Sequence, residues 1–146
     1  MQTTRGIIYG ADYPIRSIRS RGYKLILNLL PANDFTNTIS RPGRDGVLAS
    51  WVRADPERAR AYRNRPAVEL YDLQEDPWER RNRADDPALS EVLETLRGRL
   101  EAWMQSNGDR GLETERAAFE HMNPRIVERV RARWGDEAFP TDDVGR

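Results

Sequence analysis

The sequence contains no cysteine, one histidine and one lysine, Lys24. Without cysteine the chain forms neither a disulfide nor a thiolate metal site. Cysteine usage therefore does not indicate whether the chain resides in an oxidising or a reducing compartment. Runs of about 18 apolar residues are also missing, and residues 1–5 lack the apolar core of a secretory signal. We therefore expect no membrane span and no membrane partner, while the localisation of the chain itself is left unknown.

The formal net charge of the chain is zero, because 24 Lys and Arg residues balance 24 Asp and Glu residues. A neutral chain gains little from counterion release, so we expect no nucleic-acid partner. Almost all the basic residues are arginine. The planar guanidinium suits recognition of sulfate, phosphate or carboxylate, although a codon-usage habit explains the same excess.

Residues 23–30 give the clearest strand pattern, because apolar side chains alternate along them. One face carries Tyr23, Leu25, Leu27 and Leu29. A turn at residues 20–22, with Gly22 able to take positive φ, predicts a hairpin with a strand at 15–20. Further strands are expected at 5–9 and 68–73.

The stretch from residue 31 to residue 66 loses this periodicity and is predicted to be mostly loop. A short helix is expected at 56–62, because Asp55 can cap its amino end and Pro56 suits the first helical position.

The strongest helix prediction covers residues 87–106. Its apolar residues recur at i, i+3, i+4 and i+7, and they are Leu89, Val92, Leu93, Leu96, Leu100, Trp103 and Met104. Asp86 can cap the amino end, and Asn107-Gly108 ends the helix. A weaker helical tract follows to residue 121, a second begins at Asn123-Pro124, and the residues from 136 onward are expected to be a frayed tail.

These elements predict an α+β fold, a small antiparallel sheet of 3–4 strands covered by a long C-terminal helix. We expect a compact subdomain over residues 1–107 and a helical extension with a tail over 108–146. A core of this size gives only marginal stability alone, as is typical of a segment that packs against a larger structure.

Two segments carry a family resemblance. Residues 13–26, YPIRSIRSRGYKLI, resemble the P-x-R-x-(I/V)-R-x-x-x-Y-K-L-I hairpin near the C-terminus of type I sulfatases. Residues 65–79, RPAVELYDLQEDPWE, resemble that family's R-P-x-x-E-L-Y-D-L-x-x-D-P-x-E strand and turn, and Asn82-Arg83-Ala84 stands where the family has N-L-A before a helix. The chain therefore resembles the C-terminal subdomain of a sulfatase over residues 3 to about 107.

The resemblance is greatest to the sulfamidase-like (heparan N-sulfatase, N-sulfoglucosamine sulfohydrolase) branch, through Ser50-Trp51 and Arg65-Pro66. It implies an alkaline-phosphatase-like parent fold. Within it, Tyr71 is expected to seal a strand against the long helix, and Asp76-Pro77 to fix a turn.

A family sulfatase needs a cysteine or serine oxidised to formylglycine in Cys/Ser-X-Pro-X-Arg, and a calcium site. We identify no catalytic and no metal-binding residue in this chain, and expect no cofactor in it. The resemblance implies calcium and formylglycine in the full-length enzyme, a missing catalytic domain as partner, a sulfated carbohydrate as substrate, and a periplasmic or secreted parent.

Several residues still invite a functional interpretation. Ser40-Arg41-Pro42-Gly43-Arg44 matches the short catalytic pattern but is interpreted as coincidence, because the flanking residues and the position in the chain differ. His121 has no second ligand nearby, and Asp85-Asp86 and Asp142-Asp143 are explained by capping and a solvated tail.

The candidates for substrate contact are Thr4 and Arg5, where the chain enters its first strand. Arg5 could hold a sulfate or carboxylate bidentately, or form an ion pair between strands or domains.

The leading hypothesis is therefore a C-terminal fragment of a sulfatase, inactive alone, whose parent hydrolyses a sulfuric ester or sulfamate on a sulfated sugar. The alternative is a non-enzymatic protein-binding module that uses the helical arm at 112–134. A third hypothesis is a hydrolase that depends on Ser40.

Overall fold

The computed structural model describes residues 2–4, 13–35, 47–117 and 123–134. They form an α+β structure in which β-strands β1 (Gln2–Thr4), β2 (Ile15–Arg19), β3 (Tyr23–Asn28) and β4 (Val68–Asp72) make one sheet in the order β1-β2-β3-β4. All neighbouring strands are antiparallel. The predicted α+β class and antiparallel sheet are confirmed.

The predicted hairpin is β2 and β3, with Ile18 opposite Leu25. Its turn differs from the prediction, because Gly22 is not among the positive-φ glycines of the described chain. The turn is held instead by Ser20, whose backbone N–H donates to the Tyr23 carbonyl at 2.8 Å and whose Oγ accepts from the Tyr23 N–H at 3.0 Å. A hydroxyl bond therefore replaces the expected left-handed glycine.

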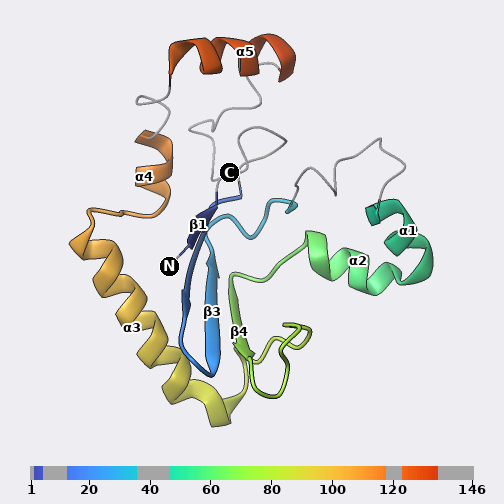
Figure 1. Ribbon diagram of the computed structural model, residues 1–146, viewed down its shortest axis with the longest axis vertical. Helices are drawn as coiled ribbons and strands as arrows, with labels where there is room; N and C mark the ends of the chain where they lie inside the picture. The colour runs from blue at the N-terminus through green and yellow to red at the C-terminus, as the bar shows by residue number, and fades with distance from the viewer. Residues whose placement is uncertain (1, 5–12, 36–46, 118–122, 135–146) are drawn as a thin grey trace.

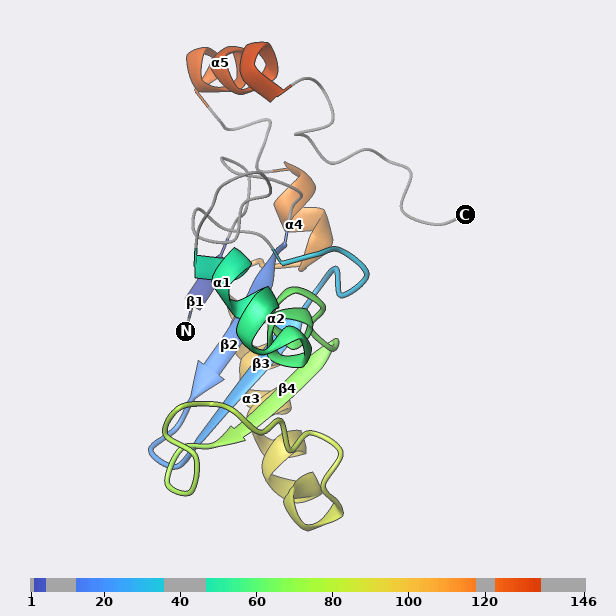
Figure 2. The same ribbon diagram turned by 90° about the vertical axis from the view of Figure 1, so that its right-hand side faces the viewer.

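The long helix α3 (Ser90–Ser106) lies along one face of the sheet (Figures 1 and 2). The core between them contains Ile18, Leu25 and Leu70 from the strands and Leu89, Leu93, Leu96 and Leu100 from the helical side. The predicted period-2 and 3.6-residue patterns therefore meet as expected. Only the first turn differs, because residues Pro87–Leu89 form the 3-10 helix η1, capped by Asp86, whose side chain accepts from the Ala88 N–H.

The predicted helix at 56–62 is confirmed as α2 (Pro56–Arg63), with Asp55 accepting from the Arg58 N–H at 3.0 Å. A preceding helix, α1 (Val47–Ala54), was not predicted and corrects the loop assignment of that stretch. Its apolar residues Val47, Leu48, Trp51 and Val52 have helical spacing. The eight-residue length made the pattern hard to recognise.

Beyond α3 the chain forms α4 (Leu112–Ala117) and α5 (Pro124–Trp134), which occupy the predicted arm. Asn123 caps α5 through a 3.0 Å bond from the Arg125 N–H. The strand predicted at 5–9, residues 118–121 of the weaker helical tract, and the tail from 136 lie outside the described residues. Within the described residues, no helix is both long and apolar enough to cross a bilayer.

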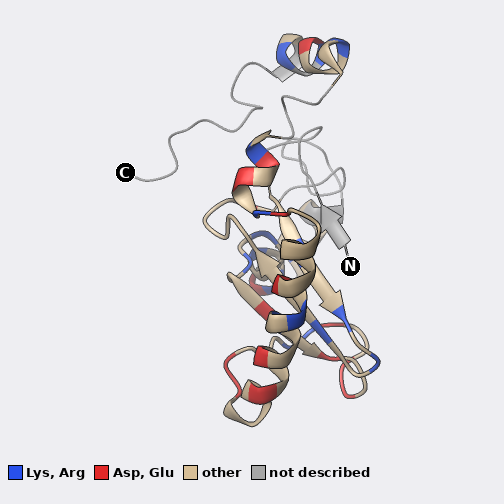
Figure 3. Ribbon diagram, turned by 90° about the vertical axis from the view of Figure 1, so that its left-hand side faces the viewer, with Lys and Arg blue, Asp and Glu red and all other residues tan. Residues whose placement is uncertain are grey.

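Charges of both signs are mixed along the described ribbon, as Figure 3 shows for α3 and the loops beside it. Among the residues that the structure describes, the most deeply buried long-range ion pair belongs to β2. The Arg16 guanidinium, 2% exposed, bonds to Asp109 at 2.5 and 2.9 Å and to Glu115 at 2.8 Å. It thereby ties the loop after α3 and the helix α4 to the sheet. The Arg16 bond holds the pKa of Asp109 below its usual range.

Candidate functional site

A pocket of about 330 Å³ lies on the sheet face opposite α3. Strand alternation builds it: Leu25 and Leu70 point to the α3 core, so Ile26, Glu69 and Tyr71 point the other way. Helices α1 and α2 supply Trp51, Arg58, Ala61 and Tyr62, the segment before β4 supplies Arg65, and the loop after β4 supplies Trp78, Glu79 and Arg80. The pocket is thus assembled from four stretches that are separate in the sequence: residue 26, residue 51, residues 58–71 and residues 78–80.

Glu69 forms the buried floor of the pocket, with 4% of its surface exposed. Its carboxylate accepts a hydrogen bond from the Asn28 side-chain amide at 2.7 Å and another from the Tyr71 hydroxyl. Arg65 lies 3.8 Å away as an ion-pair partner. Because two hydrogen-bond donors and one cation face this carboxylate, its charge is satisfied inside the protein.

This geometry corrects the role predicted for Tyr71. The sequence placed its ring against the long helix, but Leu70 takes that position, and Tyr71 alternates to the pocket face. Burial, followed by the bond to Glu69, raises the pKa of Tyr71 well above its usual range. The hydroxyl therefore stays protonated as a donor and is a poor nucleophile.

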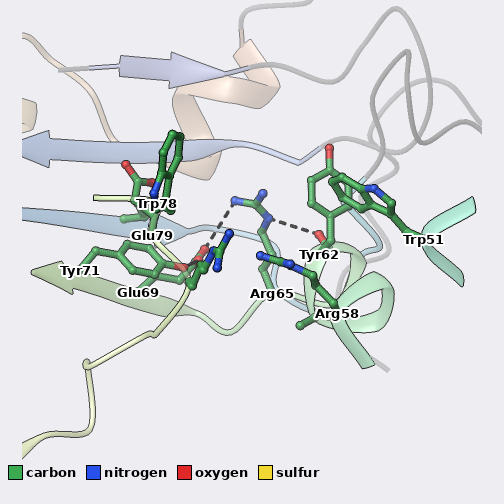
Figure 4. A pocket seen from close by; sticks show the side chains of 11 residues that line it. Trp51, Arg58, Tyr62, Arg65, Glu69, Tyr71, Trp78 and Glu79 are labelled. Carbon is green, nitrogen blue, oxygen red and sulfur yellow. Dashed lines mark hydrogen bonds and ion pairs between the residues drawn. The ribbon is translucent and has the colours of Figure 1, made fainter. Parts of the chain in front are cut away.

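An aromatic chain supports the other wall. The rings of Tyr13 and Phe35, Phe35 and Tyr62, and Tyr62 and Trp51 pack edge to face, with centroids 5.3, 5.4 and 5.5 Å apart. The Arg65 guanidinium stacks over Phe35 at 4.2 Å and donates to the Tyr62 carbonyl at 3.3 Å. These contacts fix Arg65 between the aromatic wall and Glu69, as Figure 4 shows.

The loop of residues 73–81 closes the opposite side. Asp76 accepts from the backbone N–H groups of Arg80 and Arg81, at 2.5 and 2.8 Å, which confirms the predicted turn. Glu79 takes a left-handed backbone conformation, with φ of 53°, and its carboxylate pairs with Lys24 at 2.6 Å. Trp78 is left 78% exposed at the rim of the pocket.

The lining residues favour binding over catalysis. Among the described residues that line the pocket there is no serine, cysteine, histidine or lysine, and both carboxylates are engaged by cations of the fold. Exposed arginines and aromatic rings remain for a ligand. The sequence did not predict this convergence, because the four segments are brought together only by the tertiary fold.

The residues singled out by the sequence fall elsewhere. Thr4 belongs to the edge strand β1, paired with Ile15, while Arg5 lies outside the described residues. Residues 40–44 and 142–143 and His121 also lie outside them, so their interpretation stays a prediction. Asp86 caps η1 and pairs with Arg83, as a structural role requires.

Comparison with known proteins gives the family. The chain is 32% identical over 109 residues to an ulvan-active sulfatase of Formosa agariphila, an alignment covering 75% of this chain and 21% of that protein. It is 32% identical over 105 residues to the human N-sulphoglucosamine sulphohydrolase, covering 67% of this chain and 21% of that enzyme. A second ulvan-active sulfatase of the same bacterium is 28% identical over 102 residues.

The chain is a sulfatase C-terminal part. No family model matches it. This sulfatase chain spans about one fifth of the length of the curated relatives it matches. The predicted family resemblance is confirmed, and the pocket described above therefore lies in the smaller, C-terminal portion of a sulfatase.

Proposed function

We propose that this sulfatase chain acts as the structural C-terminal subdomain of an enzyme that hydrolyses a sulfuric ester or sulfamate on a sulfated sugar. The observation that supports this most is the coverage: two sulfatases match at 32% identity, but over only 21% of their length. The parent fold in this proposal is alkaline-phosphatase-like. The subdomain formed by the sheet and α3 packs against the catalytic domain in this proposal.

Within the sulfatase family, this proposal assigns the chain to the sulfamidase-like branch. The name of the human relative, a sulphohydrolase of N-sulphoglucosamine, agrees with it, while the names of the bacterial relatives describe sulfatases active on ulvan. A glycosaminoglycan or a related sulfated glycan is therefore the proposed substrate class.

The chemistry of the parent belongs to the missing part in this proposal. The described residues contain no group of three or more His, Cys, Asp or Glu side chains that could hold a metal ion. The whole sequence also has no cysteine to become formylglycine. These residues do not fit a calcium site, so calcium and formylglycine are assigned to the catalytic domain and no reaction step is derived from this chain.

The experiment is an assay of sulfate release from heparan and ulvan oligosaccharides. The purified chain alone is expected to release no sulfate, and the chain joined to its catalytic domain is expected to be active. Activity of the chain alone that disappears in Ser40→Ala would overturn the proposal in favour of the serine-dependent hydrolase.

The alternative, a protein-binding module that uses the arm at 112–134, has one supporting feature. On α5, Ile126 is 44% exposed, which leaves apolar surface for a partner. Deleting residues 123–134 separates the two functions. The sulfatase proposal expects sulfate release by the joined enzyme to persist, whereas a binding module would lose its partner.

A further inference from the structure

The pocket opposite α3 carries a surplus of positive charge. Its lining contains three arginines and two glutamates. Glu69 is engaged by Arg65, Asn28 and Tyr71, and Glu79 is engaged by Lys24, which lies outside the lining. Both negative charges are therefore neutralised by groups that belong to the fold.

Arg58 and Arg80 remain available to a ligand. Both are exposed, and neither guanidinium forms an ion pair with any carboxylate of the described residues. They come from different segments, since Arg58 lies in the first turn of α2 and Arg80 in the loop after β4, yet they line one pocket. Two planar donor groups converging on one cavity suit an oxyanion that accepts several hydrogen bonds.

Aromatic rings flank these charges. Trp78 is 78% exposed and Trp51 is 40% exposed, although a tryptophan normally gains by burial. Figure 4 shows Arg58 and Arg65 between Trp78 on one side and Tyr62 with Trp51 on the other. Exposed rings and guanidinium groups that line one pocket offer an apolar face and a cation to the same ligand, which matches a pyranose ring that bears an anionic group.

The size of the pocket agrees with a small unit. Its volume of about 330 Å³ is at the lower end of the range of about 300–1,000 Å³ that small-molecule sites occupy. A sugar unit with one anionic substituent is therefore a better match than a long oligosaccharide lying wholly inside.

We propose that this pocket binds one sulfated or carboxylated sugar unit of a glycan, with Arg58 and Arg80 holding the anionic group and Trp78 stacking on the ring. Glu69, Tyr71 and Arg65 form a rigid floor that positions the walls and does not itself take the anion. The sugar class rests on the proposed function, but the site acts by binding alone.

The test is isothermal titration of the full 146-residue chain with a sulfated disaccharide, a uronate-containing disaccharide, the desulfated neutral disaccharide and inorganic sulfate. Binding of the anionic sugars with at least about 10-fold weaker binding of the neutral sugar is expected, since each charged hydrogen bond lost costs about this factor. Equal binding of inorganic sulfate would show an anion site without a sugar site. Absence of saturable binding would overturn the proposal.

Matched variants locate the site. Arg58→Gln with Arg80→Gln, and separately Trp78→Ala, are expected to weaken binding of the sulfated disaccharide about 10-fold or more. Arg99→Gln on the exposed side of α3 should leave binding unchanged. Circular dichroism of each variant establishes that the chain is folded. Unchanged affinity in both folded pocket variants would refute the assignment.

Sulfate release by the joined enzyme is measured separately from sugar binding by the chain, so that the two proposals can fail independently. A chain that binds anionic sugars although the joined enzyme releases no sulfate would retain this inference and sink the proposed function. A joined enzyme that releases sulfate although the chain binds no sugar would do the reverse.

Discussion

Arg16 forms the most deeply buried long-range ion pair among the described residues. Its guanidinium is 2% exposed and is shared by Asp109 and Glu115, which are 93 and 99 positions away in the sequence. An arginine in a strand next to a turn gives no hint of such distant partners. The sequence therefore could not predict this contact, although it predicted the strand that carries Arg16.

Removing this cation is expected to destabilise the chain strongly. In Arg16→Met the carboxylates of Asp109 and Glu115 lose their shared partner, and the free energy of unfolding should fall by about 3–5 kcal/mol. Urea denaturation followed by circular dichroism measures the change. The control is Arg110→Ala, whose exposed pair with Glu113 should contribute under about 1 kcal/mol. Equal effects of the two substitutions would contradict the role of Arg16.

The same ion pair predicts a dependence on pH. The bond from Arg16 lowers the pKa of Asp109 in the folded chain, so its stabilising effect is complete above the ordinary aspartate pKa of about 3.9 and is lost as pH falls through the lower folded value. Unfolding free energy should therefore decrease between about pH 5 and pH 2. Asp109→Asn should flatten part of that slope, and an identical slope in the variant would argue against this carboxylate.

At the scale of elements, the long periodic segments were predictable and the short ones were not. The helix containing Leu93, Leu96 and Leu100 and the strand containing Leu25 both follow from apolar spacing, because one buried face fixes the period. Helix α1 has only eight residues, so its apolar pattern was hard to distinguish within a stretch rich in turn residues. The sequence analysis assigned Tyr71 to the face that α3 covers, but Leu70 occupies that face. The alternation of a strand therefore identifies its two faces without showing which one the helix covers.

Two glycines, one inside α3 and one just after its end, test how the backbone conformation of each position affects stability. Gly98 lies inside the helix with open space around its Cα, so Gly98→Ala should stabilise the chain by about 0.4–1 kcal/mol. Gly108 ends the helix at φ of 67° and also has open space, so Gly108→Ala should cost about 1 kcal/mol through the backbone alone. Thermal denaturation measures both, and changes of the same sign would contradict the assignment.

The core side of α3 gives a larger effect. Leu100 is 1% exposed against the sheet, so Leu100→Ala should lower the free energy of unfolding by about 2–5 kcal/mol. The neighbouring exposed position supplies the control, since Glu101→Ala should change it by no more than about 0.5 kcal/mol. Chemical denaturation distinguishes the two, and a small loss in Leu100→Ala would mean that the helix does not bury this face.

At the scale of the whole molecule, the sheet, one covering helix and a pocket on the other face make a coherent unit. The family could be predicted from two motifs, residues 13–26 and 65–79, because they combine strand, turn and cap positions in a fixed order. The pocket could not, since its lining residues are spread from Ile26 to Arg80 and share no spacing. Only the antiparallel pairing of β3 with β4 and the return of α2 bring them together.

This chain is the C-terminal part of a sulfatase, and the central proposal is that the chemistry lies in an adjoining segment. The most direct measurement is to sequence the DNA immediately upstream of the Met1 codon. The account predicts an open frame encoding Cys/Ser-X-Pro-X-Arg followed by Thr-Gly and an aspartate pair. A frame closed by a stop codon, with no such motif upstream, would contradict it and favour the protein-binding module.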